Sequence, residues 1–303
     1  MSGICEGRVV VVTGGGRGLG RAHALEFARQ GASVVVNDLG SEVDGSGATV
    51  GPAAEVVAEI ETMGGRAVAD GSDIADWDGA ATLIQRAIDT YGQVDTLVNN
   101  AGILRDRMLT NMSVDEWDSV IRVHLRGTFA PTHWAASHWR ERAKAGEAND
   151  ARVINTSSAS GLYGNPGQTN YGAAKAGIAA FTLIAAKELV RYGVTVNAIA
   201  PGARTRMTEG LGMAAIEEPD AGAFDAFAAE NVSPLVVWLG SNESAAVTGQ
   251  VFNVAGGRIS VAEGWRAGPS VDKEDRWDPA ELAGVVPDLV ARAAPPPDMF
   301  GNA

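Results

Sequence analysis

Short apolar runs rich in valine alternate along this chain with longer stretches in which apolar residues recur every three or four positions. Two of the runs, Val10–Val12 and Val34–Val36, are apolar at every position. A strand that is apolar on both faces is typical of a parallel sheet covered by helices on both sides. Because the alternation continues without an obvious linker, the pattern predicts a single α/β domain built around a parallel sheet.

The alternation predicts seven strands and five helices. Strands are expected at Arg8–Thr13, Ser33–Asn37, Arg66–Asp70, Thr96–Asn99, Arg152–Ser157, Thr195–Ala200 and Gln250–Val254. Helices are expected near Leu19–Gln30, Ala53–Met63, Trp77–Tyr91, Val114–Arg142 and Asn170–Tyr192.

Two segments interrupt this alternation. Leu39–Pro52 is a glycine-rich loop longer than most strand–helix connections, so we expect it to be functional or mobile. The tail from Trp265 onward carries charges and prolines. We therefore expect a domain over residues 1–264 and a C-terminal segment over residues 265–303 that packs as an arm or is partly disordered.

The overall charge narrows the classes of partner. The chain has 303 residues, a formal net charge of −13 and one cysteine, Cys5. Nucleic acids and anionic membranes need a positively charged surface, so we expect neither as a partner. No apolar stretch reaches the ~18–20 residues of a membrane span, the start lacks the features of a signal peptide, and the last three residues are not a peroxisomal address. A soluble, cytoplasmic protein without intrachain disulfides is expected.

Three glycines stand between the first strand and the first helix, in the run VVVVTGGGRGLGRAHALEFA. At Gly14, Gly18 and Gly20 the backbone can approach a pyrophosphate closely, and the helix start offers free N–H groups and the positive end of the helix dipole. An ordinary glycine-rich turn is the alternative. The strand before the motif and the helix after it are the context that a dinucleotide site requires, so the sequence predicts such a site here.

A second motif, YGAAK, places Tyr171 and Lys175 one helical turn apart on the same face. A free tyrosine has a pKa of about 10, and a neighbouring ammonium lowers that pKa toward the working range of an acid–base catalyst. Ser158 ends a predicted strand, where ligands of open α/β sheets bind, and would hold the substrate oxygen. A tyrosine and a lysine at this spacing often form a surface pair by chance, so the prediction rests on these three residues together with the glycine loop.

The order and spacing of these motifs resemble the short-chain dehydrogenase/reductase family. The glycine motif reads T-G-x-x-x-G-x-G, NNAG (Asn99–Gly102) ends the fourth strand, two serines end the fifth, Y-x-x-x-K follows, and Pro201–Gly202 comes after the sixth. The match covers about residues 5–260. The resemblance implies a single-domain Rossmann-type fold, which is a doubly wound seven-stranded parallel sheet with helices on both faces. It also implies hydride transfer between a nicotinamide cofactor and an alcohol or ketone.

The resemblance further implies which residues hold the cofactor. Asp38 ends the second strand and would accept both ribose hydroxyls and repel a 2′-phosphate, although a turn-forming or capping aspartate also fits there. Arg17 favours NADP instead, because a basic residue in the glycine loop often accompanies NADP in this family. We give Asp38 more weight, since its charge would lie against the phosphate oxygens, and expect NAD. The expected cofactor-binding residues are Gly14, Arg17, Gly18, Leu19, Gly20, Asp38, Asp73, Ile74, Asn100, Ala101, Gly102, Tyr171, Lys175, Pro201, Gly202, Ala203 and Thr205.

The expected catalytic residues are Ser158, Tyr171 and Lys175, with His124 in a supporting part. The family usually has an asparagine at position 124, within N-L-x-G, whereas this chain reads RVHLRGTF. The resemblance implies that the backbone carbonyl at this position can still hold a water, as it does for the family's asparagine, whereas it implies no role for the different side chain. A histidine in the middle of a helix is more often a packed core residue than a catalyst. No metal site is expected.

Further stretches, namely NNAGILRDR, RVHLRGTF and SSASGLYGNPGQTNYGAAKAG, resemble the (3R)-hydroxyacyl-CoA dehydrogenase unit of peroxisomal multifunctional enzymes of type 2, also called 17β-hydroxysteroid dehydrogenase type 4. This implies NAD-dependent oxidation of an acyl-CoA thioester, either fatty-acyl or steroid-derived. Thr205–Val232 corresponds to the family's substrate lid. Four basic residues would either meet the CoA phosphates or form surface salt bridges, and these are Arg105, Arg107, Arg126 and Arg206.

Other functions remain open. An NADP-dependent 3-oxoacyl-carrier-protein reductase would run the same chemistry in reverse, and a dehydrogenase of free hydroxysteroids or sugar alcohols would use the same site. A non-catalytic nucleotide sensor would tolerate the loss of Ser158, Tyr171 or Lys175, but all three are present. Apolar helical faces near Ala176–Ala186 and Leu235–Leu239 predict a homodimer or homotetramer, unless these stretches are buried within one subunit.

Overall fold

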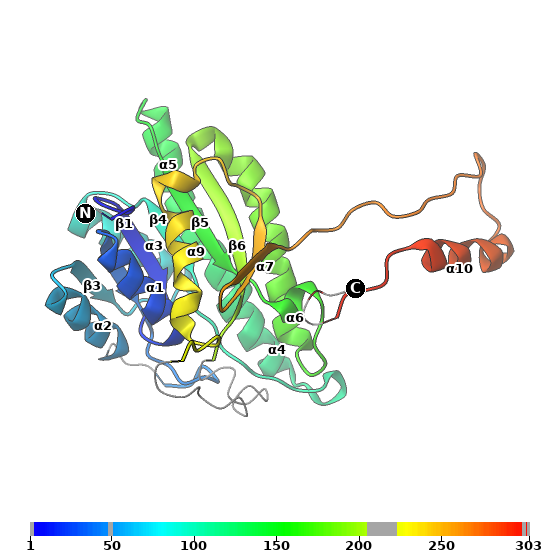
Figure 1. The fold of residues 1–303 in the computed structure, drawn as a ribbon, viewed down its shortest axis with the longest axis horizontal. Coiled ribbons are helices and arrows are strands. Elements are labelled where there is room, and N and C mark those ends of the chain that lie inside the picture. Colours follow the sequence, from blue (N-terminus) through cyan, green and yellow to red (C-terminus); the bar gives the residue numbers. More distant parts are fainter. Residues whose placement is uncertain (1–2, 48–50, 205–222, 299–300, 302–303) are drawn as a thin grey trace.

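The computed structural model describes residues 3–47, 51–204, 223–298 and 301. They form an α/β fold in which one sheet lies between two layers of helices (Figure 1). Thr205, Arg206 and most of the expected lid, Thr205–Val232, lie outside the described residues.

The sheet has eight strands in the order β3-β2-β1-β4-β5-β6-β7-β8. The first seven run parallel, and the predicted doubly wound architecture is confirmed. These strands are β1 (Val9–Thr13), β2 (Ser33–Asn37), β3 (Arg66–Asp70), β4 (Thr96–Asn99), β5 (Ala151–Thr156), β6 (Val194–Gly202) and β7 (Val251–Ala255). Because parallel strands end at one edge of the sheet, the residues after β1, β2, β4, β5 and β6 meet there.

The prediction of seven strands misses a short antiparallel one. β8 (Arg258–Val261) pairs with β7 after a turn at Gly256 and Gly257. Gly256 has a φ of +54°, a left-handed conformation that glycine adopts readily. Two adjacent glycines followed by alternating polar and apolar residues are a hairpin signal, but four residues are too few for the alternation alone to predict a strand.

Helices cover both faces of the sheet, and the apolar strands pack against both layers (Figure 1). The longer helices are α1 (Gly18–Arg29), α2 (Gly51–Thr62), α3 (Trp77–Tyr91), α5 (Gly127–Lys144), α7 (Thr169–Leu189) and α9 (Ser233–Gly240). Shorter helical turns are α6 (Ala159–Leu162), η1 (Leu109–Asn111), η3 (Val190–Tyr192), η5 (Ala229–Asn231) and η6 (Asn242–Ser244). Val10 and Val12 of β1 pack in one core with α1, α2 and α9, whereas Val9 and Val11 pack in a second core with α3, α5 and α7. Strands that are apolar on both faces are therefore covered by helices on both faces, as predicted.

The predicted helix Val114–Arg142 is interrupted near its start. α4 (Val114–Ile121) passes into a π-helical turn, η2 (Arg122–Arg126), before α5 begins. A π-helical turn holds more residues than an α-helical one, so it rotates the side chains that follow it, and such turns are frequent at functional sites. This turn carries His124, which is buried at 1% exposure.

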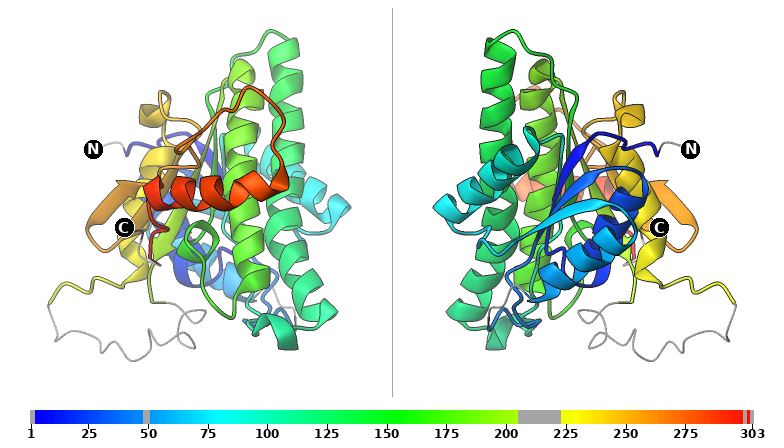
Figure 2. Two further views of the ribbon diagram at one scale, coloured as in Figure 1. Left: turned by 90° about the vertical axis from the view of Figure 1, so that its right-hand side faces the viewer. Right: turned by 90° about the vertical axis from the view of Figure 1, so that its left-hand side faces the viewer.

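Beyond β8 the chain leaves the body of the molecule. Residues 262–298 form an arm that carries η7 (Pro279–Glu281) and α10 (Leu282–Arg292), and α10 stands apart from the sheet and its helices (Figures 1 and 2). Within the described part of the chain, no helix is long and apolar enough to cross a bilayer.

Candidate active site

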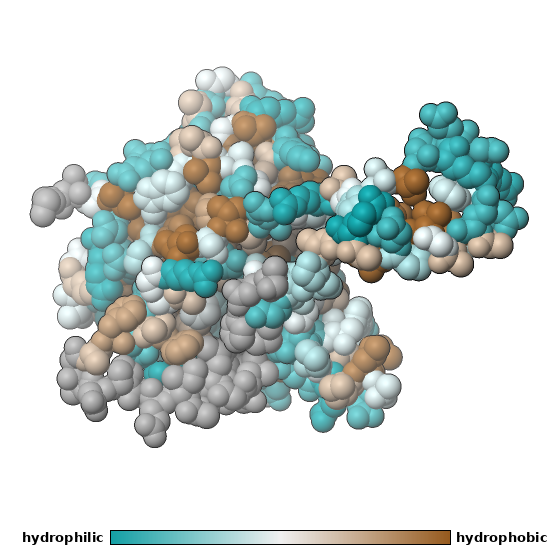
Figure 3. Space-filling view, turned by 45° about the vertical axis from the view of Figure 1, so that its right-hand side comes forward, coloured by the Kyte–Doolittle hydropathy of each residue, from teal (hydrophilic) through white to brown (hydrophobic). Residues whose placement is uncertain are grey.

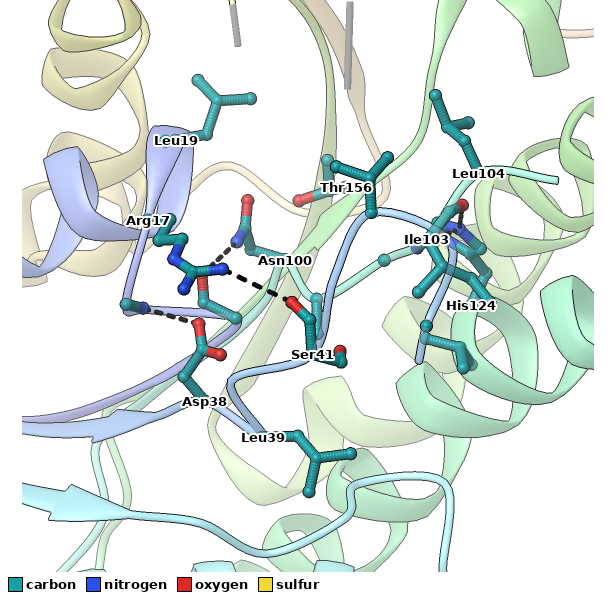
Figure 4. A pocket seen from close by; sticks show the side chains of 18 of the residues that line it. Arg17, Leu19, Asp38, Leu39, Ser41, Asn100, Ile103, Leu104, His124 and Thr156 are labelled. Atoms are coloured by element: carbon teal, nitrogen blue, oxygen red, sulfur yellow. Dashed lines mark hydrogen bonds between the residues drawn. The ribbon is translucent and has the colours of Figure 1, made fainter. Parts of the chain in front are cut away.

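A pocket of about 720 Å³ opens at the carboxyl ends of β1, β2, β4, β5 and β6. Figure 4 shows side chains from these elements and from η2 around one hollow. The pocket brings together sixteen of the predicted residues: Gly14, Arg17, Gly18, Leu19, Asp38, Asp73, Ile74, Asn100, Ala101, Gly102, His124, Ser158, Tyr171, Lys175, Pro201 and Ala203. Gly20 and Gly202 do not line it, and Thr205 lies outside the described residues.

The glycine loop is shaped for a close approach of the backbone. Gly14 has a φ of +61°, and a Cβ there would lie 2.7 Å from the Cα of Ala101. A Cβ on Gly20 would lie 2.0 Å from the carbonyl oxygen of Gly14, so Gly20 lets α1 pack against the loop although it does not face the pocket. Asn100 holds the loop in place, because its Nδ2 donates to the carbonyl oxygens of Thr13 and Gly14 at 3.0 and 3.1 Å.

Asp38 forms the wall of the pocket opposite the start of α1. Its Oδ2 accepts from the backbone N–H of Gly16 at 2.8 Å, and its Oδ1 accepts from that of Gly40 at 2.6 Å (Figure 4). Each carboxylate oxygen can accept more than one hydrogen bond, so the group remains able to take ligand hydroxyls. Arg17 turns away from this carboxylate, and its Nη1 donates to the carbonyl oxygen of Ser41 at 3.5 Å.

The glycine-rich loop after Asp38 crosses to the other side of the pocket. The Leu104 N–H donates to the Val43 carbonyl oxygen at 2.9 Å, and Arg105 Nε donates to that of Asp44 at 2.7 Å. Several loop residues then line the pocket, and the sequence analysis did not name any of them as site residues: Leu39, Ser41, Glu42, Val43 and Gly45. Loops lack a hydrophobic period, so no sequence pattern indicated which of their residues face inward.

Asp73 and Ile74 follow β3 at the far end of the pocket. Asp73 Oδ1 accepts from the Ala75 N–H at 2.9 Å, and its Oδ2 pairs with Arg122 at 2.6 Å. Ile74 is buried at 7% exposure, and a Cβ on Gly127 would lie 2.8 Å from its Cδ1. The pair therefore offers a flat apolar wall beside a fixed carboxylate.

Tyr171 and Lys175 face the same pocket from α7. Lys175 Nζ lies 5.5 Å from the centroid of the Tyr171 ring and donates to the carbonyl oxygen of Thr156 at 2.6 Å. Burial lowers the pKa of Lys175 to about 7 and raises the pKa of Tyr171 to about 12, while a hydrogen bond donated by the Ser158 hydroxyl to the Tyr171 oxygen opposes that rise. Burial thus opposes the expected lowering of the Tyr171 pKa by Lys175 and the oxidised nicotinamide, and that lowering stays a prediction.

Ser158 sits between β5 and α6, at the N-cap of that short helix. Its Oγ accepts from the backbone N–H of Ser160 at 3.2 Å. A hydroxyl that already accepts from one side keeps its own proton to donate elsewhere. The local turn therefore orients Ser158 as a donor toward the space beside Tyr171.

His124 lines the pocket and packs against the ring of Tyr171. Its Nε2 lies 2.8 Å from the carbonyl oxygen of Ile103 (Figure 4). Its ring meets that of Tyr171 edge-on, at 5.1 Å between centroids. Burial, reinforced by Lys175, lowers the pKa of His124 to about 3, so the imidazole is neutral at ordinary pH. A Cβ on Gly102 would lie 2.3 Å from the imidazole Cε1, which explains the glycine at that position.

The sequence analysis missed a polar network beside these residues. Gln168 Nε2 donates to Asp106 Oδ2 at 2.7 Å, and Gln168 Oε1 accepts from the Ser160 hydroxyl at 2.6 Å. Burial raises the pKa of Asp106, and the charge of Asp106 in turn raises that of Tyr171. Asp106 and Gln168 are 62 positions apart, so only the folded topology brings them together.

Two observations indicate that the pocket fits a dinucleotide. The first is the glycine cradle, which any Cβ at Gly14 would close. The second is Thr156, which lines the pocket and whose buried Oγ1 has no hydrogen-bond partner among the described residues. A buried hydroxyl without a partner is costly, so this one is suited to a polar group of a ligand.

Two of the four basic residues expected at the CoA phosphates form salt bridges. Arg105 bonds to Asp115 at 3.3 Å, and Arg107 bonds to Glu116 at 3.1 Å. These contacts match the surface salt-bridge interpretation. Arg126 is exposed, and Arg206 lies outside the described residues.

The chain is similar in sequence and in structure to known dehydrogenases. A sequence model of the short chain dehydrogenase family matches residues 8–214. The chain is 45% identical to the hydroxyacyl-CoA dehydrogenase ChsB1 of Mycobacterium tuberculosis, over 96% of this chain and 90% of that protein. It is also 45% identical to the peroxisomal multifunctional enzyme type 2 of Mus musculus, over 84% of this chain and 32% of that longer protein. The crystal structure of a short chain dehydrogenase from Mycobacterium avium superposes with a TM-score of 0.88 at 59% identity, covering 98% of this chain and 99% of that one.

Proposed function

We propose that this chain, which belongs to the short-chain dehydrogenase family, oxidises 3-hydroxyacyl-CoA thioesters to 3-ketoacyl-CoA thioesters with NAD. The observation that carries the proposal is the meeting of Ser158, Tyr171 and Lys175 with the glycine loop and Asp38 in one pocket. Enzymes of this family are oxidoreductases that act on CH–OH groups. The name of the M. tuberculosis relative supports a hydroxyacyl-CoA as the alcohol.

Asp38 supports NAD over NADP. Its carboxylate stands beside the glycine loop, where an adenosine ribose would lie. A ribose hydroxyl would donate to it, whereas a 2′-phosphate would bring two negative charges together in a partly buried site. Arg17 is engaged by the loop carbonyl of Ser41 and so does less to offset that repulsion.

Ser158, Tyr171 and Lys175 have different roles in the oxidation of the substrate alcohol. Ser158 donates a hydrogen bond to the oxygen of the 3-hydroxyl group, and the phenolate of Tyr171 accepts the proton from that hydroxyl. NAD⁺, when bound, would supply the hydride acceptor for the hydrogen on the carbinol carbon. As the O–H and C–H bonds break, the C=O bond of the 3-ketone forms, so the substrate loses two electrons and two hydrogens in balance.

Lys175 assists by its position and charge. Its bond to the Thr156 carbonyl fixes Nζ close to the Tyr171 ring. A charged Nζ stabilises the phenolate and so opposes burial and the charge of Asp106, which together raise the pKa of Tyr171 to about 12. His124 holds the opposite edge of the Tyr171 ring, so the phenol cannot swing away from the substrate.

The test is a steady-state assay with a panel of 3-hydroxyacyl-CoA thioesters of short, long and steroid-derived chains, each as both enantiomers. Each is assayed with NAD and with NADP, and the Tyr171→Phe variant serves as the blank. We expect turnover of at least one thioester with NAD, and a lower kcat/KM with NADP. If no thioester reacts with NAD while NADPH-dependent reduction of 3-oxoacyl-carrier-protein thioesters is fast, the reductase is the correct function instead.

A further inference from the structure

Gln168 is a buried amide in the wall of the pocket, beside Tyr171. It is 2% exposed, and it lines the pocket together with Tyr171 and Lys175. Gln168 is the N-cap residue of α7, so it stands three positions before Tyr171 and seven before Lys175. Residues at these spacings share one face of a helix, and the amide is therefore presented on the side of α7 that carries the proposed proton acceptor.

Three neighbouring side chains fix the orientation of this amide. Gln168 Oε1 accepts from Ser160 Oγ at 2.6 Å and from Asn165 Nδ2 at 2.9 Å. Gln168 Nε2 donates to Asp106 Oδ2 at 2.7 Å. A carbonyl oxygen can accept two hydrogen bonds, so Oε1 is fully used. An amide turned over would face its oxygen toward the carboxylate of Asp106, so the NH₂ group keeps its direction.

One hydrogen of this NH₂ group is left to donate. Nε2 carries two hydrogens, and within the described ranges of the chain Asp106 is the one acceptor bonded to it. A donor that is withdrawn from water and lacks a partner is costly, so the second hydrogen is suited to an acceptor on a ligand in the pocket. The negative charge of Asp106 strengthens the N–H groups as donors and repels anions, so the fitting acceptor is a neutral oxygen such as that of a carbonyl group.

Ser160 joins the amide of Gln168 to Ser158. The Ser160 N–H donates to Ser158 Oγ at 3.2 Å, and the Ser160 hydroxyl donates to Gln168 Oε1 at 2.6 Å. The donor proposed for the 3-hydroxyl oxygen and the unused donor of Gln168 are thus linked through a single residue. In a 3-hydroxyacyl thioester, one methylene group separates the carbon of the hydroxyl from the carbonyl carbon. Two donors that lie close together in the pocket wall therefore match two oxygens that lie close together in the substrate.

Gln168 lies on the opposite side of Tyr171 from Lys175 along α7. Lys175 reaches the end of β5, where its Nζ donates to the Thr156 carbonyl oxygen at 2.6 Å. Gln168 instead adjoins the segment after β4, because it forms a parallel bridge with Arg107. The unused donor is therefore placed for the substrate, on the side of Tyr171 away from Lys175, which is an expected cofactor-binding residue.

Beyond Gln168 the wall of the pocket continues to the surface. The Arg107 N–H donates to the Gly167 carbonyl oxygen at 2.8 Å, and the next residues, Met108 and Leu109, are 58% and 65% exposed. Figure 3 shows apolar side chains at the surface of the lower right of the body, the region where Figure 1 places α4 and α6. A substrate whose carbonyl group reaches Gln168 can thus extend its thioester arm across this surface toward solvent, as the size of a CoA group requires.

We propose that Gln168 binds the carbonyl oxygen of the substrate thioester through the second N–H of its amide, while Ser158 and Tyr171 bind the 3-hydroxyl group. This inference rests on the proposed function and adds a substrate-binding residue to it. Attachment at both oxygens fixes the rotation of the carbon chain between them, so the hydrogen on the carbinol carbon keeps one direction. A secondary alcohol without the carbonyl group is held at one oxygen alone and leaves the amide hydrogen unpaired, so it should react more slowly.

The first test compares two substrates by kcat/KM with NAD. One is the 3-hydroxyacyl-CoA thioester that the wild type oxidises fastest, and the other is its thioether, in which a methylene group replaces the carbonyl group. The wild type should favour the thioester at least about tenfold, the scale of one buried hydrogen bond. Gln168→Met keeps the length of the side chain but has no N–H group, and it should reduce this preference about tenfold. Gln250→Met, exposed and outside the pocket, should behave as the wild type.

The outcomes separate this inference from the proposed function. If the wild type oxidises the thioester without preferring it to the thioether, or if Gln168→Met lowers kcat/KM equally for both, the inference fails while the proposed function stands. If the wild type oxidises no 3-hydroxyacyl-CoA thioester, the proposed function fails and the inference fails with it. The dissociation constant for NADH should not change in Gln168→Met, and a rise that accounts for the lost activity would place the amide at the cofactor and overturn the inference.

Infrared spectroscopy of the bound substrate tests the contact itself. The thioester carries an isotopic label at its carbonyl carbon and is bound with NAD to Tyr171→Phe, in which turnover is expected to be low. A hydrogen bond to the carbonyl oxygen weakens the C=O bond and lowers its stretching frequency. The frequency should therefore rise in Tyr171→Phe/Gln168→Met, whereas Tyr171→Phe/Gln250→Met should leave it unchanged. Equal frequencies with and without the Gln168 amide would overturn the inference.

Discussion

His124 meets Tyr171 edge to face, with ring centroids 5.1 Å apart and planes at 88°. The imidazole is anchored on its other side by the backbone of Ile103. Burial lowers its pKa to about 3, so it acts here as a neutral, rigid prop. The π-helical turn carries His124, and the absence of a side chain at Gly102 leaves room for the imidazole beside Tyr171.

His124→Ala should therefore lower kcat by about a hundredfold, the scale of a misplacement of about 1 Å, with a small change in the KM for NAD. The dependence of kcat/KM on pH should keep its shape between pH 5 and 8, because a group with a pKa of about 3 does not titrate there. His138→Ala on α5, away from the pocket, is the control. Loss of an ionisation near pH 6.5 in the His124 variant would identify His124 as an acid–base group and contradict its role as a prop.

Asp38→Asn should narrow the preference for NAD over NADP by about ten- to a hundredfold, since hydrogen bonds to charged groups contribute about 1.5–3 kcal/mol. The asparagine has nearly the same size as the aspartate. Its single carbonyl oxygen can still accept a hydrogen bond from the N–H of Gly16 or of Gly40, which bond to different oxygens of Asp38. Fluorescence titration with NADH and NADPH measures the change directly. Asp44→Asn removes the same charge from the exposed loop and should leave the ratio unchanged. An unaltered ratio in the Asp38 variant would place the adenosine ribose elsewhere.

The sequence predicts those parts of the site whose residues lie close together in the chain. Gly14 and Gly18 sit in one turn, and Tyr171 and Lys175 sit one helical turn apart, so residue order alone places them. The sequence did not predict β8 because that strand is short. It did not predict η2 because one turn contains too few residues for its shift of the apolar period to be recognised.

The remaining contributions depend on the folded topology and on burial. Asp106 and Gln168 meet only because the segments after β4 and before α7 converge. The burial that raises the pKa of Tyr171 likewise depends on the fold, and the expected lowering of that pKa by Lys175 and the oxidised nicotinamide stays a prediction. A nearby positive charge lowers the pKa of a phenol, whereas burial raises it. The sequence shows that a lysine is close to Tyr171, but it does not show how deeply the phenol is buried.

Asp106→Asn should move the pH profile of alcohol oxidation to lower pH. The carboxylate raises the pKa of Tyr171, so its removal makes the phenol easier to deprotonate, and oxidation requires the phenolate. The asparagine carbonyl can still accept from Gln168, so the network keeps its geometry. The measurement is kcat/KM from pH 6 to pH 10. Asp118→Asn, exposed on α4, should not shift the profile. A shift to higher pH in the Asp106 variant would contradict the electrostatic account.

The most direct test of the central claim is the Tyr171→Phe variant, which removes one oxygen atom and keeps the ring that His124 supports. If the phenol moves the substrate proton, kcat should fall by at least about 10²–10⁴-fold while the dissociation constant for NADH stays nearly constant. Tyr192→Phe, on η3 and outside the pocket, should behave as the wild type. Turnover by Tyr171→Phe within a few-fold of the wild type would show that another group carries the proton, and the account of this site would fail.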